Sequence, residues 1–134
     1  MKVVIDTNVM VAGLLSPFGP CSEILRLASA GLLEICFDAC ILAEYREVLG
    51  RSKFGFDQEK VSVFLDYIER YGYLTAPEPL KGSLPDKDDE VFLAASISSQ
   101  AVCLITGNLA HFPENSRKGV VVLSPREFIE HYKK

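Results

Sequence analysis

The chain begins with Met1-Lys2-Val3-Val4-Ile5-Asp6-Thr7-Asn8, a β-branched apolar run that ends in an acid and two short polar residues. Such a run is typical of a strand that is buried on both faces. The pattern returns in 101–105, Ala-Val-Cys-Leu-Ile, which is followed by Thr106-Gly107-Asn108. We therefore expect inner strands at 2–6 and 101–105, each with oxygen-bearing side chains just after its carboxyl end.

The rest of the chain alternates between helix and strand patterns. Apolar residues at helical spacing predict helices over about 20–31, from Asp38 to Leu49, from Asp57 to Tyr71, over 91–99 and over 125 to about 132. Short apolar runs predict strands at 34–37 and 120–123, and a polar, proline-bearing loop is expected at 76–85. Asp38, Asp57 and the capping box at 124–127 provide the helix starts. This alternation predicts an α/β fold with a mainly parallel central sheet, helices on both faces and a single domain, 1–134.

Composition narrows the class of protein. The chain has 134 residues, 49% of them hydrophobic and 24% charged, which fits one globular domain rather than a disordered chain. No apolar run approaches the roughly 20 residues that span a bilayer, and the N-terminus lacks a signal-peptide pattern, so we expect a cytoplasmic protein with no membrane segment. The four cysteines form no Cys-x-x-Cys pair, and both histidines lie far from Cys36 and Cys40, which favours buried, inert thiols over zinc.

The densest acidic run is Asp86-Lys87-Asp88-Asp89-Glu90, ahead of the predicted helix 91–99. Acids at a helix N-terminus interact favourably with its dipole, by about 0.3–1 kcal/mol each, so one or two need no further role. Four acids within five positions repel one another, by about 4 kcal/mol for two carboxylates about 4 Å apart at an effective dielectric near 20. A bound cation would offset this repulsion.

Glu44 lies on the second predicted helix, beside its apolar stripe. Periodicity alone favours a solvated residue at the edge of the core, paired with Arg46 or Arg51. Ligands of parallel α/β sheets, however, bind beyond the carboxyl ends of the strands, and Asp6, Glu44 and an acid of 86–90 could all reach that edge.

The polar segments that follow the inner strands have two interpretations. Asp and Asn are common turn formers, so either segment alone could be structural. Together with the acids they form a set of carboxylate and amide oxygens, which suits Mg²⁺ or Mn²⁺. Such ions orient a phosphodiester and activate water for hydrolysis. The net charge of −4 argues against a broad basic surface that grips phosphates, but it allows acids in a metal-filled pocket.

Four segments resemble, in order and spacing, the PIN-domain family. They are 1–9 with its Asp-Thr-Asn opening, the helix that carries Glu44, the segment 86–95, and Leu104-Ile-Thr-Gly-Asn108. The closing Ser124-Pro-Arg-Glu-Phe128 is similar to the branch of bacterial and archaeal toxins related to VapC. The resemblance spans nearly the whole chain.

The resemblance implies a set of site residues. Asp6, Glu44 and one acid of the central run would bind metal, and counting back from Asn108 gives Glu90 as that acid, with Asp89 as its close rival. The positions expected to support the site are Thr7, Asn8, Asp86, Asp88 and Thr106. The chain departs from the family pattern at two positions, because Asn108 stands where Asp is usual and Glu90 is less usual than Asp. An amide offers an oxygen without negative charge, which would weaken a metal site.

The resemblance also implies a function. The expectation is a Mg²⁺- or Mn²⁺-dependent endoribonuclease that cleaves single-stranded RNA, is held in check by a small antitoxin and forms a homodimer. The apolar surface of Ile24–Leu33 or Val61–Tyr71 would serve a partner unless the core consumes it, and Arg46, Arg51 and Lys53 are candidate RNA contacts.

Two alternatives stay open. A degenerate PIN domain would bind RNA or protein without cutting. A phosphatase of the haloacid dehalogenase type would need Asp-x-Asp after the first strand, whereas Asn8 occupies the second position here.

Overall fold

The sheet at the centre of the molecule is parallel throughout. The computed structural model describes residues 1–80 and 84–133. Five strands lie in the order β3-β2-β1-β4-β5, and each neighbouring pair is parallel. The strands are β1 Lys2–Ile5, β2 Glu34–Phe37, β3 Tyr73–Leu74, β4 Cys103–Ile105 and β5 Val122–Leu123. The predicted α/β class and the central position of the first strand are confirmed.

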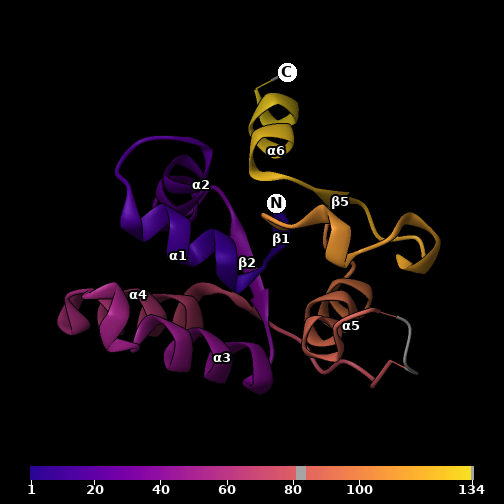
Figure 1. Cartoon of the computed structure of the whole chain (residues 1–134), viewed down its shortest axis with the longest axis horizontal. Helices are drawn as coiled ribbons and strands as arrows, with labels where there is room; N and C mark the ends of the chain where they lie inside the picture. The colour runs from indigo at the N-terminus through magenta and orange to yellow at the C-terminus, as the bar shows by residue number, and fades with distance from the viewer. Residues whose placement is uncertain (81–83, 134) are drawn as a thin grey trace.

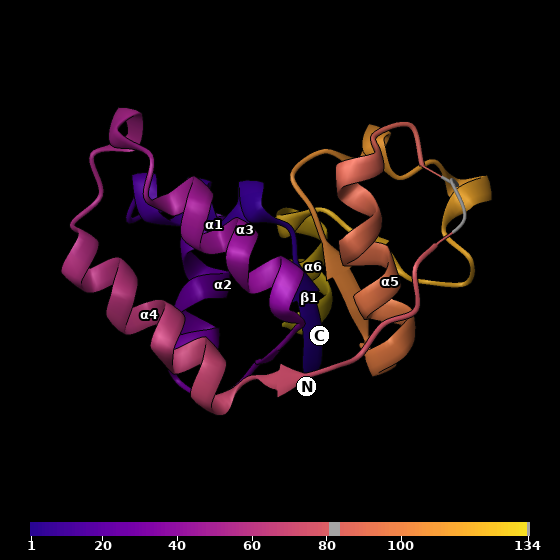
Figure 2. The ribbon, with the colours of Figure 1, turned by 90° about the horizontal axis from the view of Figure 1, so that it is seen from below.

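Helices cover both faces of this sheet. They are α1 Thr7–Leu15, α2 Pro20–Ser29, α3 Ala39–Leu49, α4 Gln58–Tyr71, α5 Glu90–Ser99 and α6 Pro125–Tyr132. Helices α1, α2 and α6 gather on one side and α3, α4 and α5 on the other (Figure 1). Figure 2 shows the second group from below, with α3 and α4 at the left and α5 at the right. Four short 3-10 helices lie in the connections: η1 Ser52–Phe54, η2 Lys87–Asp89, η3 Leu109–His111 and η4 Glu114–Ser116.

The core forms where α5 packs on the three inner strands. Val3, Val4 and Ile5 of β1 are fully buried because helices cover both sides of that strand. The register sets Ile5 beside Ile105, so β1 and β4 end together. Tyr45 of α3 is also fully buried, and its hydroxyl donates to the Ile5 carbonyl oxygen. This bond fixes α3 against the end of β1, next to Asp6.

The predicted helix starts are confirmed. The Asp38 carboxylate accepts from the Ile41 amide at 2.9 Å and caps α3. Asp57 caps α4 in the same way, and the capping box of Ser124 and Glu127 opens α6. The predicted strands are slightly longer than the observed ones. Residues 81–83 of the expected 76–85 loop lie outside the described residues, and 76–80 form neither helix nor strand.

Two elements were missed by the sequence analysis. Helix α1 is apolar on nearly all sides, and its N-cap residue Asp6 makes no side-chain capping bond, so neither signal of a helix is present. Strand β3 has only two residues, both exposed, which is too short for a periodic pattern.

The cysteines correct one expectation. All four are free; Cys36 and Cys103 are buried, as predicted, but Cys40 near the start of α3 is exposed. Burial raises the pKa of the Cys103 thiol to about 12, which makes it unreactive. In the described part of the chain, no helix is both long enough and apolar enough to cross a membrane.

Candidate functional site

Asp6 is the buried centre of a polar cluster at the carboxyl edge of the sheet. It follows β1, is 5% exposed, and its Oδ2 accepts from Thr106 Oγ1 at 2.9 Å and from Asn8 Nδ2 at 3.4 Å. Burial raises the pKa of Asp6 to about 6; the bond from Thr106 opposes this rise and the nearby Asp89 adds to it. Within residues 1–80 and 84–133, no lysine, arginine or histidine forms an ion pair with Asp6. The site therefore holds an acid that no described basic residue neutralises.

The turns after β1 and β4 are tied together beside Asp6. The Gly107 amide donates to Asn8 Oδ1 at 2.9 Å, and the Asn108 amide donates to Thr106 Oγ1 at 3.1 Å. A Cβ at position 107 would stand 3.2 Å from Asn8 Oδ1, closer than most real contacts, so glycine permits the turns to approach. The structure thus brings together Asp6, Asn8 and Thr106, as the sequence predicted, while the half-buried Asn108 follows in the same turn.

Glu44 reaches the same edge from α3. Thr7 Oγ1 donates to Glu44 Oε2, which links the helix after β1 to the helix after β2. Burial raises the pKa of the half-buried Glu44, the bond from Thr7 opposes this, and Asp6 and Asp88 raise it further. The alternative in which Glu44 pairs with Arg46 or Arg51 is not seen among the described residues, where Arg51 lies 2.9 Å from Glu47.

Asp89 is the acid of the central run that faces this pair. It is the last residue of η2, and its carboxylate is repelled by both Asp6 and Glu44. Burial raises its pKa, and the neighbouring His111 opposes that rise. His111 Nδ1 lies 2.9 Å from Asp89 Oδ2. Asp86 completes this group, with its Oδ1 accepting the Asp88 amide at 3.0 Å.

Glu90 points elsewhere. It is the first residue of α5, is 8% exposed, and its Oε2 accepts the Leu84 amide at 3.3 Å. With Lys87 it lines a hollow of about 310 Å³ beside Pro77. One step along a helix turns a side chain by about 100°, which explains how adjacent acids face different surroundings. Glu90 as a metal ligand stays a prediction, whereas its rival Asp89 lies in the field of Asp6 and Glu44.

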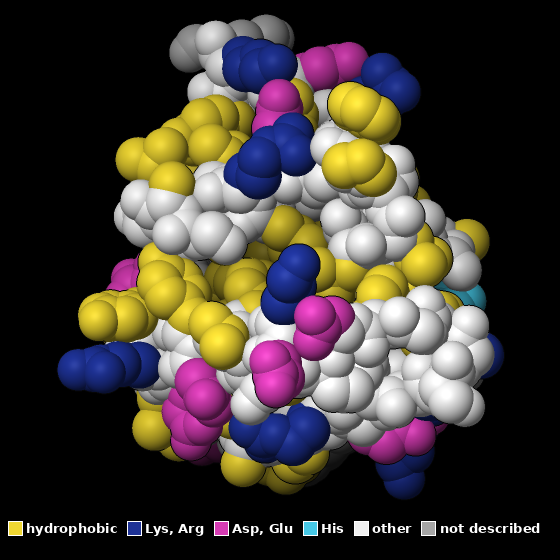
Figure 3. Space-filling view, turned by 90° about the vertical axis from the view of Figure 1, so that its left-hand side faces the viewer, with side chains coloured by type: hydrophobic (Ala, Val, Ile, Leu, Met, Phe, Trp, Pro, Cys, Tyr) yellow, Lys and Arg dark blue, Asp and Glu magenta, His cyan; other side chains and the backbone are white. Residues whose placement is uncertain are grey.

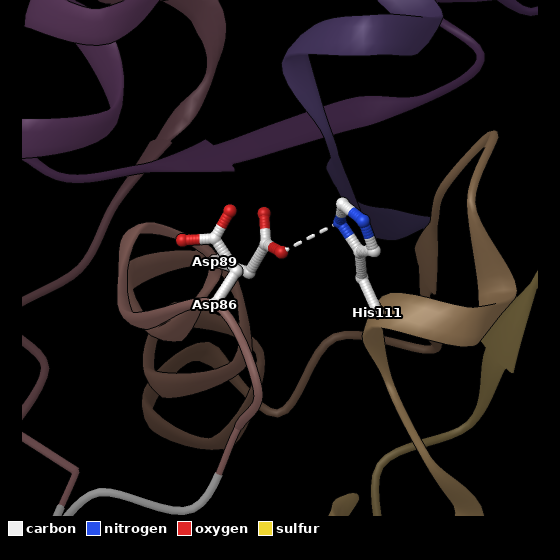
Figure 4. A group of neighbouring side chains, drawn as sticks. All are labelled: Asp86, Asp89 and His111. Atoms are coloured by element: carbon white, nitrogen blue, oxygen red, sulfur yellow. Dashed lines mark ion pairs between the residues drawn. The ribbon is translucent and has the colours of Figure 1, made fainter.

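His111 was missed by the sequence analysis, which weighed histidines only as partners of cysteine. It is brought to the site by η3, the turn that follows Asn108. Figure 4 shows its ring facing the carboxylates of Asp86 and Asp89, with the pair to Asp89 dashed. One donor atom of each of these residues lies within 4.8 Å of the others. The signal in the sequence was only the proximity of His111 to Asn108.

The predicted RNA contacts form no part of this cluster. Arg46, Arg51 and Lys53 are all exposed, on α3 and the turn that follows it. Arg51 is engaged by Glu47, and Lys53 Nζ lies 5.1 Å from the ring centroid of Phe54.

A separate apolar hollow runs between α2 and α4. The inward-facing residues of the two predicted apolar helix stripes, such as Ile24 and Leu65, are buried in the core. Others remain accessible: two adjoining hollows of about 540 and 460 Å³ share Ser29 and Phe64, and Val63 on the rim is 70% exposed. Figure 3 shows hydrophobic side chains in a hollow of this face, with basic and acidic side chains around it.

Comparison with known proteins identifies the fold. A family model described as PIN domain matches residues 2–110. An uncharacterized protein of Methanocaldococcus jannaschii is 26% identical, over the whole of this chain and 93% of its own length. A crystal structure of VapBC2 from Rickettsia felis, bound to a DNA fragment from their promoter, is similar with a TM-score of 0.59 and 16% identity. This match covers 92% of this chain and 98% of that one. FitAcB from Neisseria gonorrhoeae matches with a TM-score of 0.62, 17% identity and the same coverage.

Proposed function

The chain belongs to the PIN-domain family, and from that premise we propose that it is a metal-dependent endoribonuclease acting on single-stranded RNA. The proposal is supported by the placement of two acids at one edge of the sheet: Asp6 directly follows β1, and Thr7, the next residue, donates to Glu44. Asp89 lies near enough for its charge to raise the pKa of Asp6. Clustered, partly dehydrated carboxylates of this kind are typical of functional sites.

The donor set fits a divalent cation. Asp89 Oδ2 is a buried oxygen without a hydrogen bond in the described residues. Carboxylate oxygens are the ligands that Mg²⁺ and Mn²⁺ prefer, so Asp6, Glu44 and Asp89 would hold the ion, with Asn108 as a further predicted ligand. Glu90 is the alternative to Asp89 as the third acid. When bound, such an ion polarises the phosphodiester and activates water for attack at phosphorus.

The neutral residues around the acids have positioning roles. Thr106 and Asn8 bond to one oxygen of Asp6, and Thr7 holds Glu44. These donors fix the carboxylates without neutralising them, so their charge stays available to a cation. Asp86 and Asp88 add negative charge at the start of the turn that carries Asp89.

Cleavage assays on the purified protein test this function. With single-stranded RNA and Mg²⁺ or Mn²⁺, we expect products with 5′-phosphate and 3′-hydroxyl ends and none in EDTA. The Asp6→Asn variant should cleave about 1000-fold more slowly, because a metal site supplies several kcal/mol of transition-state stabilisation. Cyclic 2′,3′-phosphate ends, or full activity in EDTA, would contradict the proposal.

A non-catalytic PIN domain is the second candidate, and Asn108 favours it. The amide at that position adds no charge to the metal site. RNA that binds in Mn²⁺ and is never cut would identify this alternative.

The proposal includes a small antitoxin and a homodimer. Its support is the fold shared with the VapBC2 and FitAcB structures, together with the exposed apolar hollow between α2 and α4. An arginine or lysine of the antitoxin would suit the carboxylate site, since it can satisfy acids that otherwise bind metal.

Two measurements test these partners. Light scattering should show a dimer at micromolar concentration, which a strict monomer would contradict. Expression without the neighbouring gene should slow growth, whereas the Asp6→Asn variant should not. Equal growth of both strains would remove the toxin role but not the nuclease chemistry.

A further inference from the structure

Resting on the proposed nuclease function, we propose that His111 is itself a metal ligand. Together with Asp86 and Asp89, it forms the half of the site that has a nitrogen donor. This half binds a first-row transition ion such as Mn²⁺ in preference to Mg²⁺. The three donors come from two segments: Asp86 precedes η2 and Asp89 ends it, while His111 ends η3. One ligand atom of each lies within 4.8 Å of the others (Figure 4).

The contact between His111 and Asp89 is incomplete as a simple ion pair. Nδ1 and Oδ2 are 2.9 Å apart, yet Oδ2 is buried and accepts no hydrogen bond of standard geometry from the described residues. A buried acceptor without a donor is destabilising, and more so when it is charged. A cation bound to both Nδ1 and Oδ2 would satisfy these two atoms at once.

Asp89 connects this group to the rest of the site. Its carboxylate acts electrostatically on both Asp6 and Glu44, and on its other side it contacts His111. The cluster of Asp86, Asp89 and His111 therefore lies close enough to Asp6 and Glu44 for their charges to interact. This arrangement places an imidazole in a site otherwise built from oxygen donors.

The donor type determines which ion is preferred. Mg²⁺ binds oxygen ligands and keeps several waters, whereas an imidazole suits transition ions. The loss of a supporting group at a metal site typically lowers affinity by about 10–100-fold. We therefore expect His111→Gln to weaken Mn²⁺ binding by about that factor and Mg²⁺ binding by less than about threefold.

Pulsed electron paramagnetic resonance of bound Mn²⁺ tests the ligation directly. The chain has only two histidines, His111 and His131, and the second lies in the last turn of α6. Protein loaded with Mn²⁺ should show hyperfine coupling to a coordinated nitrogen, whose frequency changes on ¹⁵N labelling. The coupling should vanish in His111→Gln and persist in the matched control His131→Gln.

Calorimetric titrations separate this inference from the proposed function. The His111 side chain is 43% exposed, so the variant should fold, and circular dichroism checks this, with His111→Asn as a second variant. Nitrogen coupling without RNA cleavage would support the ligand and overturn the nuclease. Cleavage together with unchanged Mn²⁺ affinity in His111→Gln, and no nitrogen coupling in the wild type, would overturn the ligand alone.

Discussion

The two halves of the acidic site are built in different ways. Asp6 directly follows β1 and Glu44 lies within α3, and neutral hydroxyl or amide groups hold their oxygens. Asp86 and Asp89 lie at a 3-10 turn, where the partner of Asp89 is an imidazole and one buried oxygen lacks a hydrogen bond. The first half is preorganised by the sheet, while the second depends on loop geometry and on a cation that the chain does not supply.

The largest expected effect is on the free energy of unfolding, through the buried Asp6 of the first half of the site. Burial raises the pKa of Asp6 from 3.8 to about 6, which corresponds to about 3 kcal/mol. In the folded state this group binds its proton more tightly than in the unfolded state. The metal-free protein should therefore lose that stability as the pH rises from about 4 to about 6. Glu44 and Asp89 add to the loss with the same sign, since their pKa values are also raised.

Urea unfolding in EDTA between pH 4 and 7.5 measures this effect. The Asp6→Asn variant should match the wild type near pH 4 and exceed it by up to about 3 kcal/mol at pH 7.5. The exposed Asp66 of α4, changed to Asn, is the control and should follow the wild-type curve. Parallel curves for wild type and Asp6→Asn would contradict the energetic role of burial.

The same contrast explains which parts of the site the sequence predicts. Adjacent parallel strands end at one edge, so the pairing of Asp6 with Thr106 follows from two apolar runs and the rule for such sheets. Helical periodicity placed Glu44 only at the boundary of the core; its contact with Thr7 needed α1, a helix whose uniform apolarity concealed it.

The second half depends on local geometry that no pattern encodes. The direction of Asp89 and Glu90 depends on the single residue at which η2 gives way to α5. A spacing rule alone cannot locate that residue, and it selected Glu90. His111 reaches the site through η3, a three-residue turn with no sequence signal of its own. Loop conformation, rather than fold class, is what the sequence left undetermined.

The affinity for Mn²⁺ tests whether Asp89 or Glu90 is the third metal-binding acid beside Asp6 and Glu44. Asp89→Asn should weaken Mn²⁺ binding by about 10–100-fold, the range for altered metal-site residues, because its carboxylate faces Asp6, Glu44 and His111. Glu90→Gln should stay within about threefold of the wild type, since its amide oxygen can still accept from the Leu84 amide. Calorimetric titration measures both, and the reverse order would restore Glu90 as the third acid.

The smallest expected effect is on the affinity for RNA, through basic residues that lie near Glu44 in the first half of the site. Arg46, Arg51 and Lys53 are exposed beyond Glu44, and the surface pair of Arg51 with Glu47 is worth at most about 1 kcal/mol, so Arg51 can exchange it for a phosphate. Each phosphate contact on a single strand contributes about −0.7 to the slope of log affinity against log salt. Replacing the three basic residues with alanine should make that slope shallower by about 1 to 2 and weaken binding by about threefold to tenfold at physiological salt.

Fluorescence anisotropy of labelled RNA, measured in Ca²⁺ to limit cleavage, gives both the slope and the affinity. The control removes the same charge at the exposed residues Arg70, Lys118 and Arg126. Because general electrostatic attraction would weaken equally in both variants, a difference in slope between them assigns the contact to the surface beyond Glu44, and equal slopes argue against it.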